Sequence, residues 1–184
     1  MEIEKTPIEG LLVIHPNVFN DERGYFYESY CLNKYIELGV DSNFVQDNVS
    51  KSVKGVTRGL HYQVGSNAQA KLCHVLKGKV LDVAVDLRFG SPTFGEYFPV
   101  ELSDENHLQF YIPVGFAHGF SVLSEEVIFH YKCSKYYSKP DERAIIYNDP
   151  ELNIVWKTVN PIVSEKDKLA KSFRDIEKDF IYGA

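Results

Sequence analysis

Apolar and polar residues alternate over several short segments of the chain, which is the pattern of β-strands. In residues 81–87 the odd positions are all apolar, and Asp82 is among the even ones. The Lys-Gly pair at 77–78 just before this segment predicts a turn. Residues 127–133 alternate in the same way and place Tyr131 on the apolar face. We therefore expect Tyr131 to point inward.

Two segments carry the signals of short helices. Residues 32–38 end at Gly39, a residue type that often closes a helix. Residues 164–173 open with Ser164 and have Asp167 three residues later, which is close to a capping box. Many short strands with few helices predict a mostly β protein, and we expect a jelly-roll β-barrel with a few short flanking helices.

The composition fits one globular domain spanning residues 1–184. Hydrophobic residues make up 44% of the chain, which excludes a disordered protein. The formal net charge of −6 argues against a nucleic-acid partner, because such a partner requires a basic surface. The charge still allows a small anionic ligand, since a few Arg and Lys side chains can converge in one pocket.

The cysteines and the N-terminal residues indicate in which cellular compartment the protein is expected. Cys31, Cys73 and Cys133 are odd in number and far apart, so they predict neither a disulfide framework nor a zinc ribbon. We expect them to be small buried hydrophobic residues. The N-terminus lacks the apolar region of a signal peptide, and no apolar run approaches the length that crosses a membrane. These features predict a cytoplasmic protein with no membrane partner.

The candidate chemistry lies in three stretches, Arg58–Gln63, Lys71–Gly78 and Pro113–Phe120. Their spacing resembles that of the metal-binding cupin barrels at Gly55, His61, Gly78, Pro113, Gly115 and His118. Where such cupins place a second metal-binding His this chain has Gln63, and Lys71 falls near the position of their Glu. A cationic Lys repels a divalent ion and cannot ligate it. We therefore expect a cupin-like barrel without a metal.

A His, a Lys and a Tyr without a metal suit proton transfer next to a carbonyl group. His61 can take a proton at neutral pH. The Lys71 cation can stabilise a developing oxyanion, and Tyr131 can return a proton from another direction. This combination favours epimerisation or isomerisation.

Several further stretches strengthen one resemblance. They are residues 19–24, 46–48, 58–63, 82–88, 91–95, 115–120, 136–137, 148–149 and 164–167. With Arg-Gly-Leu-His-Tyr-Gln at 58–63 and Gly-Phe-Ala-His-Gly-Phe at 115–120, the chain resembles the dTDP-4-dehydrorhamnose 3,5-epimerase family over nearly its whole length. The resemblance implies inversion of C3 and C5 of dTDP-4-dehydro-6-deoxyglucose in dTDP-rhamnose biosynthesis, with no cofactor.

The resemblance also implies roles for individual residues. His61 would be the base, oriented by Asp167, while Tyr131 would be the acid and Lys71 would steady the enolate. The implied substrate-binding residues are Arg23, Glu28, Gln46, Asp47, Asn48, Arg58, Lys71, His118, Tyr137, Glu142 and Lys166. Tyr137 would stack on thymine. Arg23 and Glu28 would reach the site of a neighbouring subunit in a homodimer.

Each of these residues also has a plain structural interpretation. His61 and Tyr131 can be satisfied core residues, Lys71 a surface lysine in a turn, and Asp167 only the cap of its helix. Three other functions also stay open. They are an epimerase acting at C3 or C5 alone, a metal-dependent cupin that uses His61 and His118, and a sugar-nucleotide-binding module without catalysis.

Overall fold

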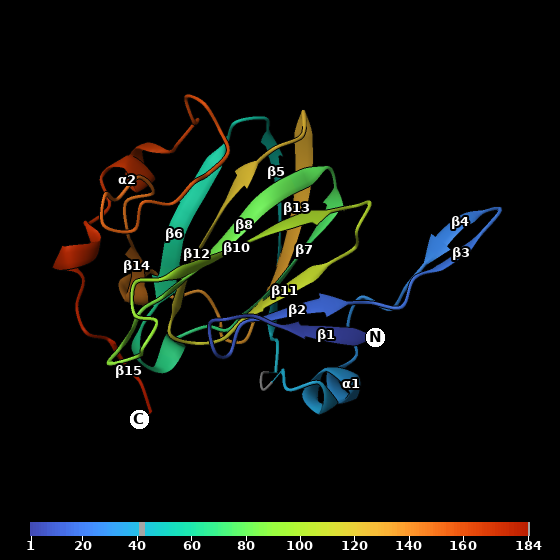
Figure 1. Ribbon diagram of the computed structural model, residues 1–184, viewed down its shortest axis with the longest axis horizontal. Helices are drawn as coiled ribbons and strands as arrows, with labels where there is room; N and C mark the ends of the chain where they lie inside the picture. Colours follow the sequence, from blue (N-terminus) through green and yellow to red (C-terminus); the bar gives the residue numbers. More distant parts are fainter. Residues whose placement is uncertain (41–42, 184) are drawn as a thin grey trace.

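The computed structural model describes residues 1–40 and 43–183, which form two antiparallel β-sheets that face each other (Figure 1). In spatial order, the six-stranded sheet contains β1 (Glu2–Lys5), β2 (Leu12–His15), β11 (Gln109–Ile112), β7 (Lys71–Lys77), β13 (Glu126–Cys133) and β5 (Gln46–Val53). The five-stranded sheet contains β10 (Tyr97–Ser103), β8 (Lys79–Asp86), β12 (Phe116–Val122), β6 (Thr57–Gln63) and β14 (Glu142–Ala144). The chain passes back and forth between the two sheets, and the prediction of a mostly β, cupin-like fold is confirmed.

Smaller elements surround the two sheets. They are the hairpin of β3 (Phe19–Asp21) and β4 (Gly24–Phe26), the parallel pair of β9 (Arg88–Phe89) and β15 (Phe180–Ile181), the helices α1 (Leu32–Glu37) and α2 (Glu165–Lys168), and 3₁₀ turns at Gly65–Asn67, Lys139–Asp141 and Phe173–Asp175. No helix in the described ranges is long and apolar enough to cross a membrane.

The predicted helix at residues 32–38 is confirmed, with Gly39 following it in a left-handed conformation. The prediction of a helix over residues 164–173 is wrong in length, because α2 ends at Lys168. Its cap is as predicted, since the Ser164 side chain accepts a hydrogen bond from the Asp167 N–H. Beyond α2 the chain is drawn back to the main body, where Lys171 forms a β-bridge with Ile145.

Three groups of apolar side chains are buried. One lies between the two sheets and includes Phe110 and Phe129. A second covers the outer face of the five-stranded sheet and joins the odd positions of 81–87 to Trp156 of the C-terminal segment. A third packs α1 on the six-stranded sheet. The apolar face of 81–87 is therefore an outer face under the C-terminal segment, while Asp82 belongs to the opposite face and is also fully buried.

The cysteine prediction is confirmed in part. All three cysteines are free, and Cys73 and Cys133 are buried on strands β7 and β13. Cys31, just before α1, is only partly buried.

Gly59 and Gly119 bring the two histidine-bearing strands β6 and β12 unusually close. A Cβ atom at Gly59 would lie 2.5 Å from the Gly119 Cα and 2.8 Å from the His118 carbonyl oxygen. The φ angle of Gly59 is +117°, which side-chain-bearing residues rarely adopt. This close approach explains a glycine in each of the two sequence stretches, and it accompanies a register shift between His118 and Phe120.

We expect Gly59→Ala to lower the free energy of unfolding by about 1–2 kcal/mol for the backbone conformation and by a further ~1–3 kcal/mol for the overlap. Gly65→Ala is the matched control, because Gly65 also has a positive φ, but apart from Gly65 and its two chain neighbours no described residue has an atom within 4 Å of the added Cβ. Urea denaturation of both variants measures the difference. Equal stability of the two variants would show that the close approach imposes no cost.

Candidate active site

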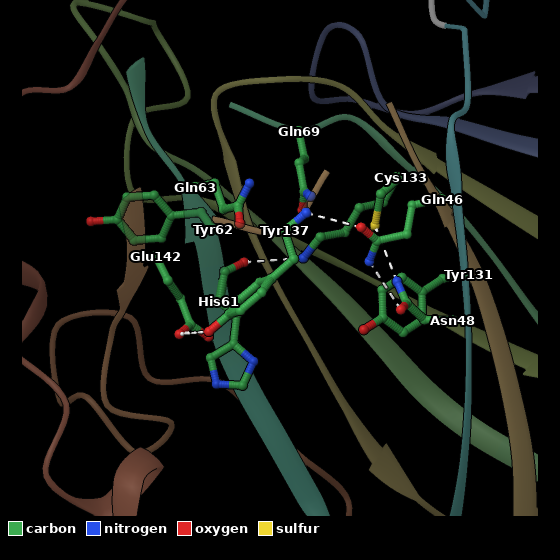
Figure 2. A pocket seen from close by; sticks show the side chains of 11 residues that line it. Gln46, Asn48, His61, Tyr62, Gln63, Gln69, Tyr131, Cys133, Tyr137 and Glu142 are labelled. Carbon is green, nitrogen blue, oxygen red and sulfur yellow. Dashed lines mark hydrogen bonds between the residues drawn. The ribbon is translucent and has the colours of Figure 1, made fainter. Parts of the chain in front are cut away.

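A cavity opens between the two sheets at the end where β6, β7 and β13 lie together (Figure 2). The six-stranded sheet contributes Gln46, Asn48, Lys71, Tyr131 and Cys133 to its wall, and the five-stranded sheet contributes His61, Gln63 and Glu142. A second, adjoining cavity is lined by residues that include Ser50, Arg58, His118 and Phe120. His61, Lys71 and Tyr131 line both cavities, so these three side chains stand where the two meet.

His61 is held by an acidic partner far away in the sequence. Its Nε2 lies 2.7 Å from Asp167 Oδ1. The Asp167 side chain is 5% exposed, whereas that of His61 is 32% exposed. Because an ionised carboxylate only accepts hydrogen bonds, Nε2 carries the hydrogen and Nδ1 remains as the basic nitrogen.

The Asp167 carboxyl is held in its ionised form. Burial opposes its ionisation, but hydrogen bonds from His61, from the Gly59 N–H and from Ser164 outweigh burial and keep the pKa of Asp167 below its usual value. Asp167 thus combines the two roles that its position allowed, since its backbone N–H serves the cap of α2 and its carboxylate binds His61.

Asp167→Asn should lower kcat roughly 10²-fold or more, because the amide orients the imidazole less strictly and cannot balance the charge that His61 gains. The KM should change little, since Asp167 lies behind His61. Steady-state kinetics measures both constants. A rise in KM with an unchanged kcat would contradict an orienting role.

Tyr131 and Lys71 approach from the other sheet. Tyr131 lies on β13 and packs against the core between the sheets, as predicted for its inward face. Burial, with small contributions from Cys133 and Cys73, raises the pKa of Tyr131 to about 12. Lys71 is 9% exposed on β7, and its Nζ donates to the His61 carbonyl oxygen at 3.3 Å. A buried ammonium group therefore lies beside the candidate base.

The raised pKa of Tyr131 gives a prediction for the pH dependence. Burial disfavours the phenolate, so the Tyr131 phenol stays protonated until the pH approaches the raised value. As the pH rises from about 7 to 9, kcat should show no loss caused by ionisation of this phenol. A pH–rate profile tests this point. A decline in that range that is absent from the residual activity of Tyr131→Phe would contradict it.

Several predicted binding residues meet at the mouth of the cavity (Figure 2). Gln46 accepts a hydrogen bond from the Tyr137 N–H at 2.9 Å and donates to Asn48 at 3.1 Å. The Tyr137 hydroxyl donates to Glu142 Oε2 at 2.9 Å, and Lys166 pairs with the same oxygen. The Tyr137 side chain remains exposed beside these contacts.

Three predicted residues lie elsewhere. On β5 the side chains alternate between faces, so Asp47 points to the outer face and pairs with Lys132 at 2.8 Å. The structure does not bring Asp47 to the cavity with its neighbours. Arg23 and Glu28 also lie outside the lining of both cavities, paired with Asp21 and Lys34.

Asp82 is the main site residue that the sequence did not single out. It is fully buried on β8, and its Oδ1 lies 2.7 Å from His118 Nε2. Burial lowers the pKa of His118, although Asp82 opposes that shift. The sequence did contain a signal for this residue, because Asp82 is an acidic residue in the middle of an apolar strand. Ser50 was also missed, and its buried hydroxyl has no hydrogen-bond partner among the residues that the structure describes.

Within the described residues, one group could bring three ligand atoms together for a metal ion, namely Cys73, Asp82 and His118. The 2.7 Å between His118 and Asp82 is a hydrogen-bond distance, shorter than the ~3.3 Å that separates two ligands of a tetrahedral zinc ion. His61 is not part of this group. The geometry of Cys73, Asp82 and His118 therefore fits a metal ion poorly. That the protein works without a metal is a prediction, which metal analysis tests.

The model of one protein family, described as dTDP-4-dehydrorhamnose 3,5-epimerase, matches residues 5–175. The chain belongs to the dTDP-4-dehydrorhamnose 3,5-epimerase family. The epimerase of this name from Shigella flexneri is 50% identical over 178 residues, covering 96% of this chain and 98% of that protein. The crystal structure of the Legionella pneumophila dTDP-6-deoxy-D-glucose-3,5-epimerase in complex with dTDP-4-keto-L-rhamnose is 50% identical, with a TM-score of 0.95 over 100% of this chain and 99% of that one.

The epimerases that resemble this chain do not all carry the same description. A dTDP-4-dehydrorhamnose 3-epimerase from Streptomyces niveus is 37% identical, covering 91% of this chain and 82% of that protein. The relatives of this chain therefore include a 3-epimerase as well as 3,5-epimerases.

Proposed function

We propose that this protein inverts C3 and C5 of dTDP-4-dehydro-6-deoxyglucose and gives dTDP-4-dehydro-L-rhamnose, the reaction described for its 3,5-epimerase relatives. The observation that supports it best is the position of His61 and Tyr131. They come from different sheets and line the same two cavities, with Lys71 beside them. A base and an acid on opposite walls suit removal of a proton from one face of a sugar and its return to the other.

The chemistry follows from these groups. Nδ1 of His61 takes the proton from a carbon next to the C4 ketone, and the electron pair of the broken C–H bond moves into an enolate. The Lys71 ammonium stabilises the negative oxygen of that enolate. Tyr131 then donates its phenolic proton to the opposite face of the carbon. Before the next cycle the phenolate regains a proton from solvent, and Nδ1 of His61 releases to solvent the proton that it took. One such cycle takes place at C5 and another at C3.

The cavity mouth suits the nucleotide. Tyr137 offers an exposed ring for thymine, and the amides of Gln46 and Asn48 offer polar contacts for the diphosphate and sugar. Arg58 adds a cation in the second cavity. Binding of the nucleotide fixes the sugar, so that its binding energy positions the reacting carbons.

A second candidate function is that of an epimerase that inverts only one of the two carbons. This candidate is favoured by the Streptomyces niveus relative, which is described as a 3-epimerase. The test is the configuration of the product after the ketone is reduced, determined by NMR. A rhamnose configuration supports inversion at C3 and C5. A product inverted at one carbon alone would replace the proposal with the second candidate.

We also propose that residues 1–184 act as a single domain in a cytoplasmic homodimer. The three free cysteines suit a reducing compartment. The β3–β4 hairpin extends away from the sheets (Figure 1) and exposes Phe19, Tyr25 and Phe26. A two-stranded hairpin with exposed aromatic side chains is marginally stable alone, so a partner subunit that covers it is favoured. Arg23 stands in this hairpin and would then reach the partner's cavity, with Glu28 following it.

Arg23→Ala should raise KM roughly 10- to 100-fold, the effect of losing one hydrogen bond to a charged group. Mixing the Arg23→Ala and His61→Ala proteins under conditions of subunit exchange tests where Arg23 acts, provided that the assay uses substrate well below the wild-type KM, where each variant alone has little activity. Random exchange makes half the dimers mixed, and each mixed dimer has one complete site, so roughly a quarter of the activity should return. No recovery after verified exchange would place Arg23 in the site of its own subunit.

A further inference from the structure

Gln63 stands two residues after His61 at the end of β6, on the same face of the strand. Its side chain is buried, and its carboxamide makes three hydrogen bonds to backbone groups of two loops. Nε2 donates to the carbonyl oxygens of Asn67 at 2.7 Å and Tyr136 at 3.2 Å, and Oε1 accepts from the Ser138 N–H at 2.7 Å. Both amide hydrogens are therefore used within the protein and none is left for a ligand.

The two Gln63 contacts at Tyr136 and Ser138 lie on either side of Tyr137. This segment lies outside the strands, and residues Tyr136 and Tyr137 are 69% and 54% exposed, so packing does not fix it. The Tyr137 N–H is itself bound by Gln46 at 2.9 Å (Figure 2). Three consecutive residues are thus held through their backbone by two glutamine side chains.

We propose that Gln63 is a positioning residue that holds the Tyr137 ring in place as a preformed wall for the base of the bound nucleotide. The inference rests on the proposed function, because it assumes a nucleoside diphosphate sugar at the mouth of the cavity. Gln63 acts through the loop and has no contact with the reacting carbons. The position that metal-binding cupins fill with a histidine serves nucleotide binding in this chain.

The chemistry of the contacts explains why the residue is an amide. The two carbonyls require a donor, and the Ser138 N–H requires an acceptor. An ionised glutamate offers no donor, a methionine offers neither group well, and a histidine cannot span all three. Loss of the amide removes three of the contacts that hold the loop, so that the nucleotide must order Tyr137 further when it binds, and affinity falls without a change in the chemical step.

The experiment compares Gln63→Met with the wild-type protein by calorimetric titration with dTDP and by steady-state kinetics. We expect the Kd for dTDP and the KM to rise roughly 10- to 100-fold, with kcat within about twofold. Tyr137→Ala should raise the Kd in the wild type but much less in Gln63→Met, because Tyr137, which keeps its contacts with Gln46 and Glu142, is positioned less firmly there. Asn106→Leu is the control. The Asn106 carboxamide also bridges backbone groups, in the turn between β10 and β11, and its loss should leave the Kd unchanged.

Each result decides the question. Unchanged dTDP affinity in Gln63→Met, or an undiminished effect of Tyr137→Ala in that background, overturns the positioning role while the proposed function stands. Failure of the wild-type protein to bind dTDP overturns both. If Gln63→Met does not fold, Gln63→Glu replaces it, since glutamate keeps the shape and the acceptor for Ser138. A rise in Kd is also expected there, because the carboxylate has no donor for the Asn67 and Tyr136 carbonyl oxygens, and no rise would reject the proposal.

Discussion

Replacing His61 with alanine should lower kcat by roughly 10³-fold or more and abolish the exchange of substrate hydrogens with solvent deuterium. His61 is the residue at the junction of the two cavities whose basic nitrogen is defined by its partner, because Nε2 is committed to Asp167. Without the imidazole, the proton next to the ketone has no acceptor on that wall. Binding of dTDP should stay largely intact, since the nucleotide contacts lie at the cavity mouth.

His15→Ala is the matched control for this variant. His15 also pairs with an acidic residue, Glu4, but it lies on β2 outside the lining of either cavity. Its loss should leave turnover unchanged. Deuterium exchange by the His61→Ala protein at the wild-type rate would remove His61 from the role of base.

In the wild type, removal of the substrate proton is coupled to inversion of the carbon, and Tyr131→Phe should separate the two. The ring and its packing stay, but the phenolic proton is lost, so formation of the inverted product should fall roughly 10²- to 10⁴-fold. His61 can still remove a proton and return one to the same face. Deuterium should therefore continue to enter the substrate without inversion of its configuration. NMR of the recovered substrate measures the deuterium, and the coupling pattern reports the configuration.

Tyr136→Phe controls for loss of a hydroxyl, because Tyr136 is a neighbouring aromatic residue with an exposed side chain that lines neither cavity. It should behave as the wild type does. Inversion at the wild-type rate by Tyr131→Phe would show that another group supplies the proton.

Much of the fold could be predicted from local patterns. The period of two along 127–133 placed Tyr131 inward, and the Lys-Gly pair at 77–78 marked the turn between β7 and β8, where Gly78 has a positive φ. These features depend on neighbouring residues alone. The length of the helix at 164–173 was wrong, because a distant contact, the bridge from Lys171 to Ile145, ends the helical segment early.

The site was harder to predict because its contacts span the chain. Residues His61 and Asp167 are 106 positions apart, and only the family resemblance joined them in advance. Alternation could not decide which face of 81–87 points inward, since both faces are buried and the C-terminal segment covers the apolar one. For the same reason Asp82 was overlooked. The outward direction of Asp47 was predictable in principle, because it alternates with Gln46 and Asn48 on one strand.

The central claim is that one cavity supplies a base and an acid to opposite faces of the sugar at two carbons. Its most direct test is proton NMR of dTDP-4-dehydro-6-deoxyglucose incubated with the wild-type protein in deuterated buffer containing a chelator. We predict that deuterium enters at both C3 and C5 and that the product has the rhamnose configuration after reduction of the ketone. Absence of exchange at either carbon, or exchange that requires an added metal, would contradict the account.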